Sequence, residues 1–315
     1  MANQNKRIAA IDMGTNSFHL IIVEVKDDGS FTLLDKEREV IRLGSHKGQD
    51  LSIISEGEME KAIDILKSFK SLADYYKAQI RAISTSAVRE AKNGKDFIEA
   101  VFNQTGISVE IIEGKEEAEL IYRGIEKALP LKNKKVLCVD IGGGSTEFIF
   151  SDNGKIIFAE SVKIGAVRLS KKFFPDYTLT PEAIKQCSDY VEEQIKANKN
   201  IDLNSKFDLC VGTSGSVNSV AYFIQQKSYS NFKKSLNGYK FSKAVFDQIN
   251  TKILNLKTVA ERIAIPGMEI KRADIIPAGM IILKKIFELF LIDEMVISEY
   301  ALREGIIVDT LRKAG

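Results

Sequence analysis

The sequence has few of the residues on which histidine and cysteine chemistry depends. Only two histidines, His19 and His46, occur among 315 residues, so neither a His-rich zinc site nor a relay of several histidines is expected. The three cysteines are odd in number and far apart, and two of them, Cys138 and Cys210, stand in apolar runs. They are therefore expected to be buried thiols in a reducing cytosol rather than a disulfide framework.

Long apolar runs and an excess of one charge are also absent. The first residues contain no apolar signal core, and the longest uncharged stretch, 209–226, is too rich in Ser, Thr, Asn and Gln to cross a bilayer. A cytoplasmic protein with no membrane partner is therefore expected. The 45 basic residues nearly cancel the 43 acidic ones, leaving a net charge of +2. Binding of duplex nucleic acid through overall charge is therefore not expected, although a local basic groove would not show in this sum.

What the sequence does contain is typical of an ordinary globular chain. Apolar residues make up 44% and charged residues 28%, which excludes intrinsic disorder, collagen and small disulfide scaffolds. A length of 315 residues fits two domains better than one or three.

Short apolar segments alternate with longer amphipathic ones, which predicts an α/β fold. Ser55 and Glu58 form a capping-box pattern before a long amphipathic helix that extends to Tyr76. Thr180 followed by Pro181 marks another helix start. Further helices are expected at 96–102, 279–291 and 298–311. Strands are expected at 8–11, 18–25, 31–34, 39–43, 81–84, 109–112, 136–139, 148–150 and 207–211.

The two halves of the chain resemble each other around two aspartates. Aligning Asp12 with Asp140 superposes a strand, an Asp-x-Gly turn and a following strand. A repeat of domain size predicts two related α/β domains rather than an array of short repeats. We place them at residues 1–125 and 126–315, packed across a cleft, with the last helix as a candidate to return to the first domain.

Three small-residue turns each follow an apolar strand, at 12–17, 140–146 and 212–216. Glycine lets the backbone approach a ligand, and the free N–H groups of such turns bind anionic oxygens, so the three turns together predict a phosphate site. Asp12 and Asp140 open two of them, and a carboxylate at a strand end beside a phosphate loop suits a hydrated Mg²⁺ ion. The alternative is that both aspartates only cap their own turns through side-chain hydrogen bonds.

Several segments, in this order, carry a family resemblance: IAAIDMGTNSFHL (8–20), STSAVREAKN (84–93), EIIEGKEEAELIYRG (110–124), VDIGGGSTE (139–147), VGTSGS (211–216), ADIIPAG (273–279) and SEYALREG (298–305). Together they resemble the exopolyphosphatase / guanosine pentaphosphate phosphatase (Ppx/GppA) family, which belongs to the sugar kinase–Hsp70–actin superfamily. The resemblance covers the chain from about residue 8 to its end.

This resemblance implies two ribonuclease-H-like domains with a phosphate cleft between them, and hydrolysis of the terminal phosphate of polyphosphate or of guanosine pentaphosphate (pppGpp). It implies Mg²⁺ or another divalent cation as cofactor, and a homodimer. Glu117 of the G-x-E-E-A element would orient the attacking water, and Arg89 would bind phosphate oxygens. Asp12, Asp140 and Glu147 would be associated with the metal. The phosphate-contacting positions would be Gly14, Thr15, Asn16, Ser17, Gly142, Gly143, Gly144, Ser145, Gly212, Thr213 and Ser214.

Longer members of that family continue into additional helical domains, whereas this sequence stops at Gly315, so the short form with two lobes is expected. A basic track for a long polyanion would then have to come from the lobes or from a second subunit. The candidates are Lys132, Lys134, Lys135, Lys171, Lys172, Lys233, Lys234, Lys271 and Arg272.

Other interpretations of the same residues stay open. The acidic residues at 116–119 also suit a helix dipole, Arg89 also suits a solvated surface, and His19 is expected to pack in its hairpin rather than act in catalysis. Kinases and ATPases of the superfamily share the Asp-x-Gly loops, and a non-catalytic sensor of polyphosphate or of an alarmone nucleotide would need only to bind. The G-x-E-E-A and S-T-S-A-x-R elements favour the phosphohydrolase.

Overall fold

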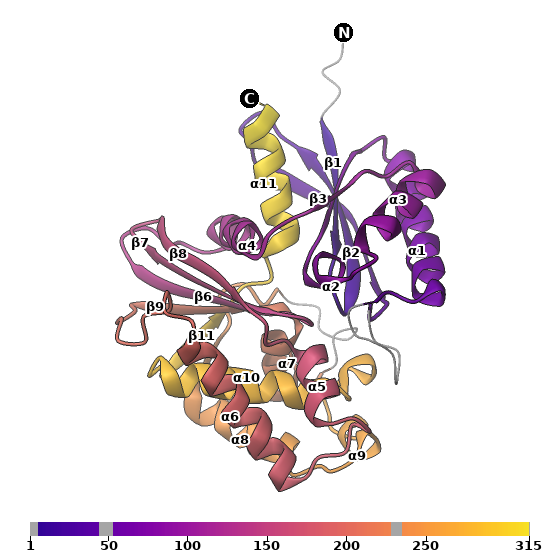
Figure 1. Cartoon of the computed structure of the whole chain (residues 1–315). Coiled ribbons are helices and arrows are strands. Elements are labelled where there is room, and N and C mark those ends of the chain that lie inside the picture. Colours follow the sequence, from indigo (N-terminus) through magenta and orange to yellow (C-terminus); the bar gives the residue numbers. More distant parts are fainter. Residues whose placement is uncertain (1–5, 44–52, 228–234, 315) are drawn as a thin grey trace. The chain divides into compact units, whose positions relative to one another are not determined.

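Each of the two units into which the chain divides is built around its own β-sheet (Figure 1). The computed structural model describes residues 6–43, 53–227 and 235–314. The first unit comprises Met1–Gly124 and Leu302–Gly315, and the second comprises Ile125–Ala301. The predicted α/β class is confirmed.

The sheet of the first unit has the strand order β3-β2-β1-β4-β5. β1, β2 and β3 are antiparallel neighbours, whereas β4 and β5 run parallel to β1, which is the ribonuclease-H-like arrangement. The sequence predicts two short strands at 31–34 and 39–43, but the structure has one continuous β3, because it pairs with β2 along its length around a single register shift. The strands are β1 (Arg7–Met13), β2 (Ser17–Val25), β3 (Phe31–Val40), β4 (Gln79–Ser84) and β5 (Val109–Ile111).

Helices cover both faces of this first sheet. α1 and α3 lie on one side and α11 on the other, where α11 packs against β1 (Figure 1). The capping box before α1 is confirmed: the Ser55 amide donates to the Glu58 carboxylate over 2.9 Å, and the Glu58 amide donates to the Ser55 hydroxyl over 3.4 Å. The helices are α1 (Glu56–Tyr75), α2 (Ser86–Glu90), α3 (Gly94–Thr105), α4 (Gly114–Ala128) and α11 (Leu302–Ala314).

The sheet of the second unit has the order β10-β11-β9-β6-β7-β8. Its part β8-β7-β6-β9-β11 repeats the order and the strand directions of the first sheet. The strands predicted near 136, 148 and 207 are present, whereas β8, β10 and β11 were not predicted. The strands are β6 (Lys135–Ile141), β7 (Thr146–Asp152), β8 (Lys155–Val162), β9 (Leu209–Thr213), β10 (Lys240–Ser242) and β11 (Glu294–Ile297).

The helices of the second unit include the one predicted from Thr180 and Pro181, where the Thr180 hydroxyl accepts a hydrogen bond from the Ala183 amide. The last predicted helix begins four residues late, because the Ser298 hydroxyl bonds the Tyr300 carbonyl in a turn instead. The helices of this unit are α5 (Ala166–Phe173), α6 (Pro181–Ala197), α7 (Ser214–Gln225), α8 (Lys243–Leu254), α9 (Val259–Ile263), the short 3₁₀ helix Ile270–Arg272 and α10 (Ile276–Leu289).

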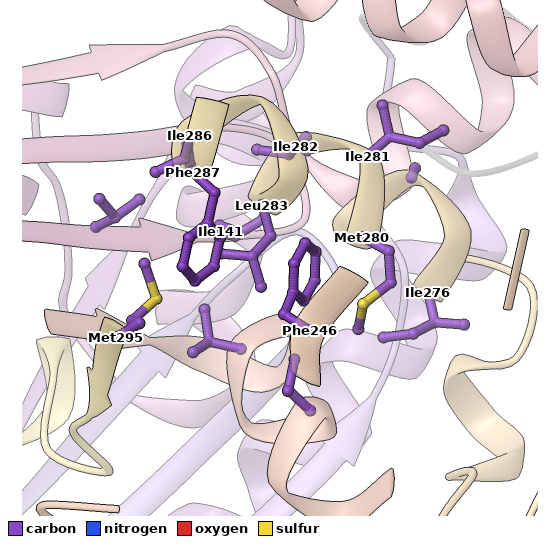
Figure 2. Packing of buried hydrophobic residues seen from close by; sticks show 14 of the residues in the cluster. Ile141, Phe246, Ile276, Met280, Ile281, Ile282, Leu283, Ile286, Phe287 and Met295 are labelled. Atoms are coloured by element: carbon purple, nitrogen blue, oxygen red, sulfur yellow. The ribbon is translucent and has the colours of Figure 1, made fainter. Parts of the chain in front are cut away.

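The core of the second unit is centred on α10, which is apolar on almost every side. Figure 2 shows Ile276, Met280 and Phe287 of α10 gathered with Phe246 of α8. The rings of Phe246 and Phe287 stack with their centroids 5.1 Å apart. Ile141, the last residue of β6, belongs to the same cluster, so the strand that leads into the glycine loop is anchored in this core.

Candidate functional site

The two Asp-x-Gly turns have the same backbone geometry. In the first unit the Gly14 amide donates to the Ser17 carbonyl over 3.2 Å, and in the second the Gly142 amide donates to the Ser145 carbonyl over 3.0 Å. Each turn joins the central strand of its sheet to an antiparallel neighbour. The internal repeat inferred from the sequence is therefore a structural repeat.

In the first unit, three predicted site elements follow the carboxyl ends of β1, β4 and β5. These strands are parallel, so their ends meet at one edge of the sheet. The Thr15 and Ser86 hydroxyl oxygens are 2.9 Å apart, which joins the first loop to the turn after β4. The Ile112 amide donates to the Ser84 carbonyl over 3.2 Å, which places the start of α4 beside the same turn.

Arg89 and Glu117, the two predicted catalytic residues, contact each other at this edge. Arg89 Nη1 donates to Glu117 Oε2 over 3.2 Å and to the Ile112 carbonyl over 2.8 Å. Both side chains are largely buried, so Arg89 is not the solvated surface group of the alternative interpretation. Glu117 lies in the first turn of α4, where the helix dipole favours the ionised carboxylate.

Asn16 is the most informative residue of the first loop. It is only 7% exposed, and neither its amide nitrogen nor its amide oxygen has a hydrogen-bond partner within the part of the chain that the structure describes. Its backbone carbonyl accepts from the amides of Ile41 and Arg42, so the loop itself is fixed. A buried amide without a partner is costly, so a polar ligand group is expected to complete it.

His19 does more than pack in its hairpin. Its Nε2 lies 2.8 Å from the Ser17 hydroxyl oxygen, so it contacts a predicted phosphate-binding residue. It also lies directly across the β1–β2 pair from Asp12.

In the second unit, four polar side chains form a row across one face of the sheet. Asp140 on β6 has Thr213 on β9 as one neighbour and Glu147 on β7 as the other, and Glu147 in turn faces Ser161 on β8. Side chains paired in this way have their Cβ atoms about 5 Å apart. The Ser161 hydroxyl donates to Glu147 Oε1 over 2.7 Å.

The carboxylates of Asp140 and Glu147 fit a magnesium ion. They are 9% and 1% exposed, and two neighbouring buried carboxylates repel each other unless a cation or a proton lies with them. Mg²⁺ is usually bound by one or two carboxylates, waters and substrate phosphate oxygens rather than by a protein cage. In agreement with that, no group of three or more His, Cys, Asp or Glu side chains arranged to hold a metal occurs among the described residues.

The equivalent row in the first unit is different in chemistry. There Asp12 has Ile83 and His19 as neighbours, and His19 faces Arg38. One carboxylate beside an imidazole offers a hard cation fewer oxygen ligands than the carboxylate pair of the second unit does. The association of Asp12 with a metal stays a prediction.

The glycine loop of the second unit presents unused backbone donors. The Gly143, Gly144 and Ser145 amides donate no hydrogen bond within the described residues, whereas the Gly142 amide closes the turn. Three consecutive free N–H groups form a concavity of the kind that binds phosphate oxygens.

The third loop runs directly into the first turn of α7. Its cap residue Thr213 makes no side-chain cap, so the first amides of the helix are left for another acceptor, and a helix N-terminus of this kind suits an anion. Ser214 has a φ of 81° and donates its hydroxyl to the Ile141 carbonyl over 2.7 Å, which ties the third loop to the strand before the second.

Two arginines that the sequence analysis does not predict as site residues lie against these loops. A Cβ on Gly215 would come within 2.1 Å of Arg272 Nη1, so this guanidinium packs directly on the third loop. Arg168 Nε donates to the Gly144 carbonyl over 2.6 Å. Arg272, predicted only as part of a basic track, stands immediately before the segment 273–279 that resembles the family, whereas no such segment marks Arg168.

Three lysines proposed for a basic track, Lys132, Lys134 and Lys135, lie at the end of β6 opposite to the glycine loop. Lys135 is the first residue of β6 and the loop follows Ile141, so Lys135 is roughly 20 Å from the loop along the strand. A role of these lysines in binding a long polyanion stays a prediction. Lys172 lies 3.7 Å above the ring centroid of Tyr190, which accounts for it by a cation–π contact. Lys233 and Lys234 lie outside the described residues.

The cysteines take no part in this chemistry. All three are free and buried, as predicted for Cys138 and Cys210 from their apolar surroundings in the sequence. Burial raises the pKa of Cys187 and Cys210 to about 12 and raises that of Cys138 as well, so none offers a reactive thiolate near neutral pH. Among the described helices, none is long and apolar enough to cross a membrane.

Comparison with known proteins places these features in context. A model of the Ppx/GppA phosphatase family matches residues 21–314. The guanosine-5'-triphosphate,3'-diphosphate pyrophosphatase of Vibrio parahaemolyticus is 31% identical over 316 residues, which cover 99% of this chain and 61% of that protein. This chain therefore spans less than two thirds of the length of that relative.

Two solved structures are similar over nearly their whole length. An exopolyphosphatase from Cytophaga hutchinsonii superposes with a TM-score of 0.88 at 30% identity, covering 98% of each chain. The Aquifex aeolicus member of the Ppx/GppA family superposes with a TM-score of 0.80 at 27% identity, covering 98% of this chain and 99% of that one.

Proposed function

The chain belongs to the Ppx/GppA phosphatase family, and on that premise we propose that it is a phosphohydrolase acting on the terminal phosphate of inorganic polyphosphate or of guanosine pentaphosphate. The observation that carries the proposal is the second unit's glycine loop, where three backbone N–H groups without a partner among the described residues follow the strand that holds the buried Asp140, next to the buried Glu147. Such an arrangement accepts phosphate oxygens and the cation that accompanies them.

In this proposal Glu117 orients the water that attacks the terminal phosphorus atom in line with the leaving oxygen. Phosphoryl transfer depends more on position and charge stabilisation than on a strong base, so an ionised carboxylate held by Arg89 suits the role. The second Nη1–H contact of Arg89, to the Ile112 carbonyl, holds the guanidinium in place while it orients Glu117.

Asp140 and Glu147 would hold Mg²⁺, with Asp12 as a further candidate. When bound, the ion would neutralise negative charge on the phosphate oxygens. The backbone amides of the first two loops and of the start of α7 would bind the remaining phosphate oxygens. The side chains of Thr15, Asn16 and Ser17 would add to the first loop.

Phosphate release by the purified protein tests this proposal. Long polyphosphate, a short polyphosphate, guanosine pentaphosphate and ATP are compared with Mg²⁺ and with EDTA. We expect Mg²⁺-dependent release from at least one of the first three substrates. Hydrolysis of ATP alone would support the kinase or ATPase alternative, and binding without turnover would support the sensor.

Substitution of Glu117 tests its role within that activity. Glu117→Gln keeps the shape but removes the negative charge, so we expect kcat to fall by about a hundredfold or more. Glu116→Gln, an exposed neighbour in the same helical turn, is the matched control and should retain activity. Undiminished turnover by Glu117→Gln would exclude the water-orienting role.

Two further expectations from the family belong to the same proposal. We expect a cytoplasmic protein, which suits three free thiols, and a homodimer. Light scattering of the purified chain measures its mass in solution and tests the second expectation.

A further inference from the structure

Every carbonyl of the triple-glycine loop accepts a hydrogen bond from the start of α5. The Gly142 carbonyl accepts from the Ala166 amide over 2.9 Å. The Gly143 carbonyl accepts from the Val167 amide over 2.9 Å and from the Arg168 amide over 3.1 Å. The Gly144 carbonyl accepts from Arg168 Nε over 2.6 Å. The helix therefore engages the whole loop from one side.

This contact determines where the amides of the loop point. In a planar trans peptide, the C=O of one residue and the N–H of the next point in opposite directions. Because the carbonyls of residues 142–144 point toward α5, the N–H groups of residues 143–145 point away from it. These are the three amides that have no partner within the described part of the chain. The same peptide orientation therefore does two things: it directs the carbonyls to α5 and leaves the amides available to a ligand.

Gly165 allows α5 to come this close. A Cβ at that position would be 2.4 Å from the Gly143 carbonyl oxygen and 2.5 Å from the Gly144 carbonyl carbon, well inside contact distance. Only a residue without a side chain fits there. Arg168 then completes the contact, because the carbonyl of Gly144 lies beyond the backbone amides of the helix and is reached by a side chain instead.

The first loop lacks this arrangement. It is held by the Thr15–Ser86 hydroxyl contact and by the Asn16 carbonyl, which accepts from the amides of Ile41 and Arg42. Neither contact orients three successive amides from one side. The two Asp-x-Gly loops are therefore positioned by different means.

We propose that Arg168 is a positioning residue for phosphate binding, which holds the Gly144 carbonyl toward α5 so that the amides of residues 143–145 converge on one phosphate group of the substrate. This inference rests on the proposed function for the identity of the anion. The hydrogen bond is charge-assisted and short, and it fixes the last peptide of the loop, whose N–H belongs to Ser145. Without it, that peptide is free to rotate and the concavity loses its third donor.

The test compares Arg168→Ala and Arg168→Lys with a matched control. Lys185→Gln removes a charge from the neighbouring helix α6, at an exposed side chain that pairs with Asp189 and belongs to no proposed site. The first measurement is amide hydrogen exchange of the peptides covering residues 141–146 in the ligand-free protein. The second is the affinity for tripolyphosphate with Mg²⁺, measured by calorimetry in a Glu117→Gln background so that no substrate is consumed.

For Arg168→Ala we expect the hydrogen-bonded amides of 141–146, among them the Gly142 amide that closes the turn, to exchange about tenfold faster, and tripolyphosphate affinity to be about tenfold weaker, the size of one lost charge-assisted hydrogen bond. Arg168→Lys should lie between Arg168→Ala and the wild type, because an ammonium group can donate to the Gly144 carbonyl without the fixed fork of a guanidinium. Lys185→Gln should match the wild type in both measurements. If Arg168→Ala does not fold, the exchange and the affinity of Arg168→Lys are compared with those of the wild type instead.

Two results would overturn the inference. Unchanged exchange with weaker binding would mean that Arg168 touches the anion directly, and unchanged exchange with unchanged binding would mean that it has no role in the loop. The two proposals can fail separately, because exchange is measured without substrate. If the wild-type protein hydrolyses none of the phosphates, the proposed function is wrong. The exchange measurement still decides whether Arg168 positions the loop.

Discussion

Asp140 lies directly across the β6–β7 hairpin from Glu147, and both carboxylates lie on one buried face of the sheet. The equivalent neighbour of Asp12 is His19. The two repeats thus keep the aspartate but differ in the residue beside it, and only one of them has a pair of oxygen ligands. This difference predicts an unequal dependence on magnesium.

Asp140→Asn is expected to raise the Mg²⁺ concentration needed for half-maximal activity by about tenfold or more, because one of two adjacent carboxylate ligands becomes neutral. Asp12→Asn is expected to change that concentration less. Magnesium titrations of phosphate release measure both. Asp152→Asn, at the opposite end of the same hairpin and facing Lys135, is the control. Equal magnesium dependence of Asp140→Asn and the wild type would contradict the assignment.

Arg89 and Glu117 are expected to act as one unit, because a single guanidinium nitrogen contacts the carboxylate and the Ile112 carbonyl. Arg89→Ala should reduce kcat by about tenfold or more through misplacement of Glu117. The double variant Arg89→Ala/Glu117→Gln should then be little slower than Glu117→Gln alone. The measurement is kcat for the four members of this cycle. If the fold reduction in kcat of the double variant equals the product of the reductions in the two single variants, the two residues contribute independently.

Asp309 ties α11 to the first unit through a cluster of cations. Its carboxylate accepts from Arg81 over 2.7 Å, from Lys313 over 3.0 Å, and from Arg123. Burial alone would raise the pKa of Asp309, but the hydrogen bonds from Arg81 and Lys313 outweigh it and hold that pKa below its ordinary value. The ionised form therefore stabilises the folded state.

Asp309→Asn is expected to lower the free energy of unfolding by about 2 kcal/mol near pH 7, because the buried Arg81 guanidinium loses one of its two counter-charges and keeps only Glu110. Since the folded pKa is depressed, the stabilisation is complete above the unfolded value of about 4 and is lost as the pH falls through the folded value. The difference between wild type and variant should therefore shrink in acid. Urea unfolding followed by circular dichroism at several pH values measures it.

The control for that experiment is Asp64→Asn, which breaks an exposed ion pair with Lys67 on α1. It should change stability by less than about 1 kcal/mol. A pH-independent difference between wild type and Asp309→Asn would mean that the loss comes from packing rather than from charge.

Local patterns in the sequence were enough to predict the parts of the fold that have strong local signals. The β1–β2 hairpin, the capping box of α1 and the Thr180-Pro181 start of α6 each depend on residues a few positions apart. β10 and β11 are three and four residues long, too short for periodicity to appear, and were missed, whereas the equally short β5 was predicted from its β-branched residues Val109 and Ile111. They exist because neighbouring strands provide their hydrogen bonds.

In the candidate site, too, the features that depend on local sequence were predicted and those that depend on tertiary contacts were not. The glycine loops and their aspartates were visible because their spacing is local. The contact between Arg89 and Glu117 depends on the parallel pairing of β4 with β5, and the role of Arg168 depends on the return of the chain from β8 into α5. Closeness in sequence is a poor guide for the lysines at 132–135, which lie at the other end of an extended strand from the glycine loop.

The assignment of α11 to the first unit sets the order in which the protein can mature on the ribosome. The second unit is one continuous segment, Ile125–Ala301, and is complete as soon as that segment has emerged. The first unit begins the chain but needs the helix Leu302–Ala314, which packs on β1 and whose Asp309 binds Arg81. Because synthesis proceeds from the N-terminus, the unit whose translation starts first completes its fold after the second unit, and its central strand waits for a helix that is made only after residue 301.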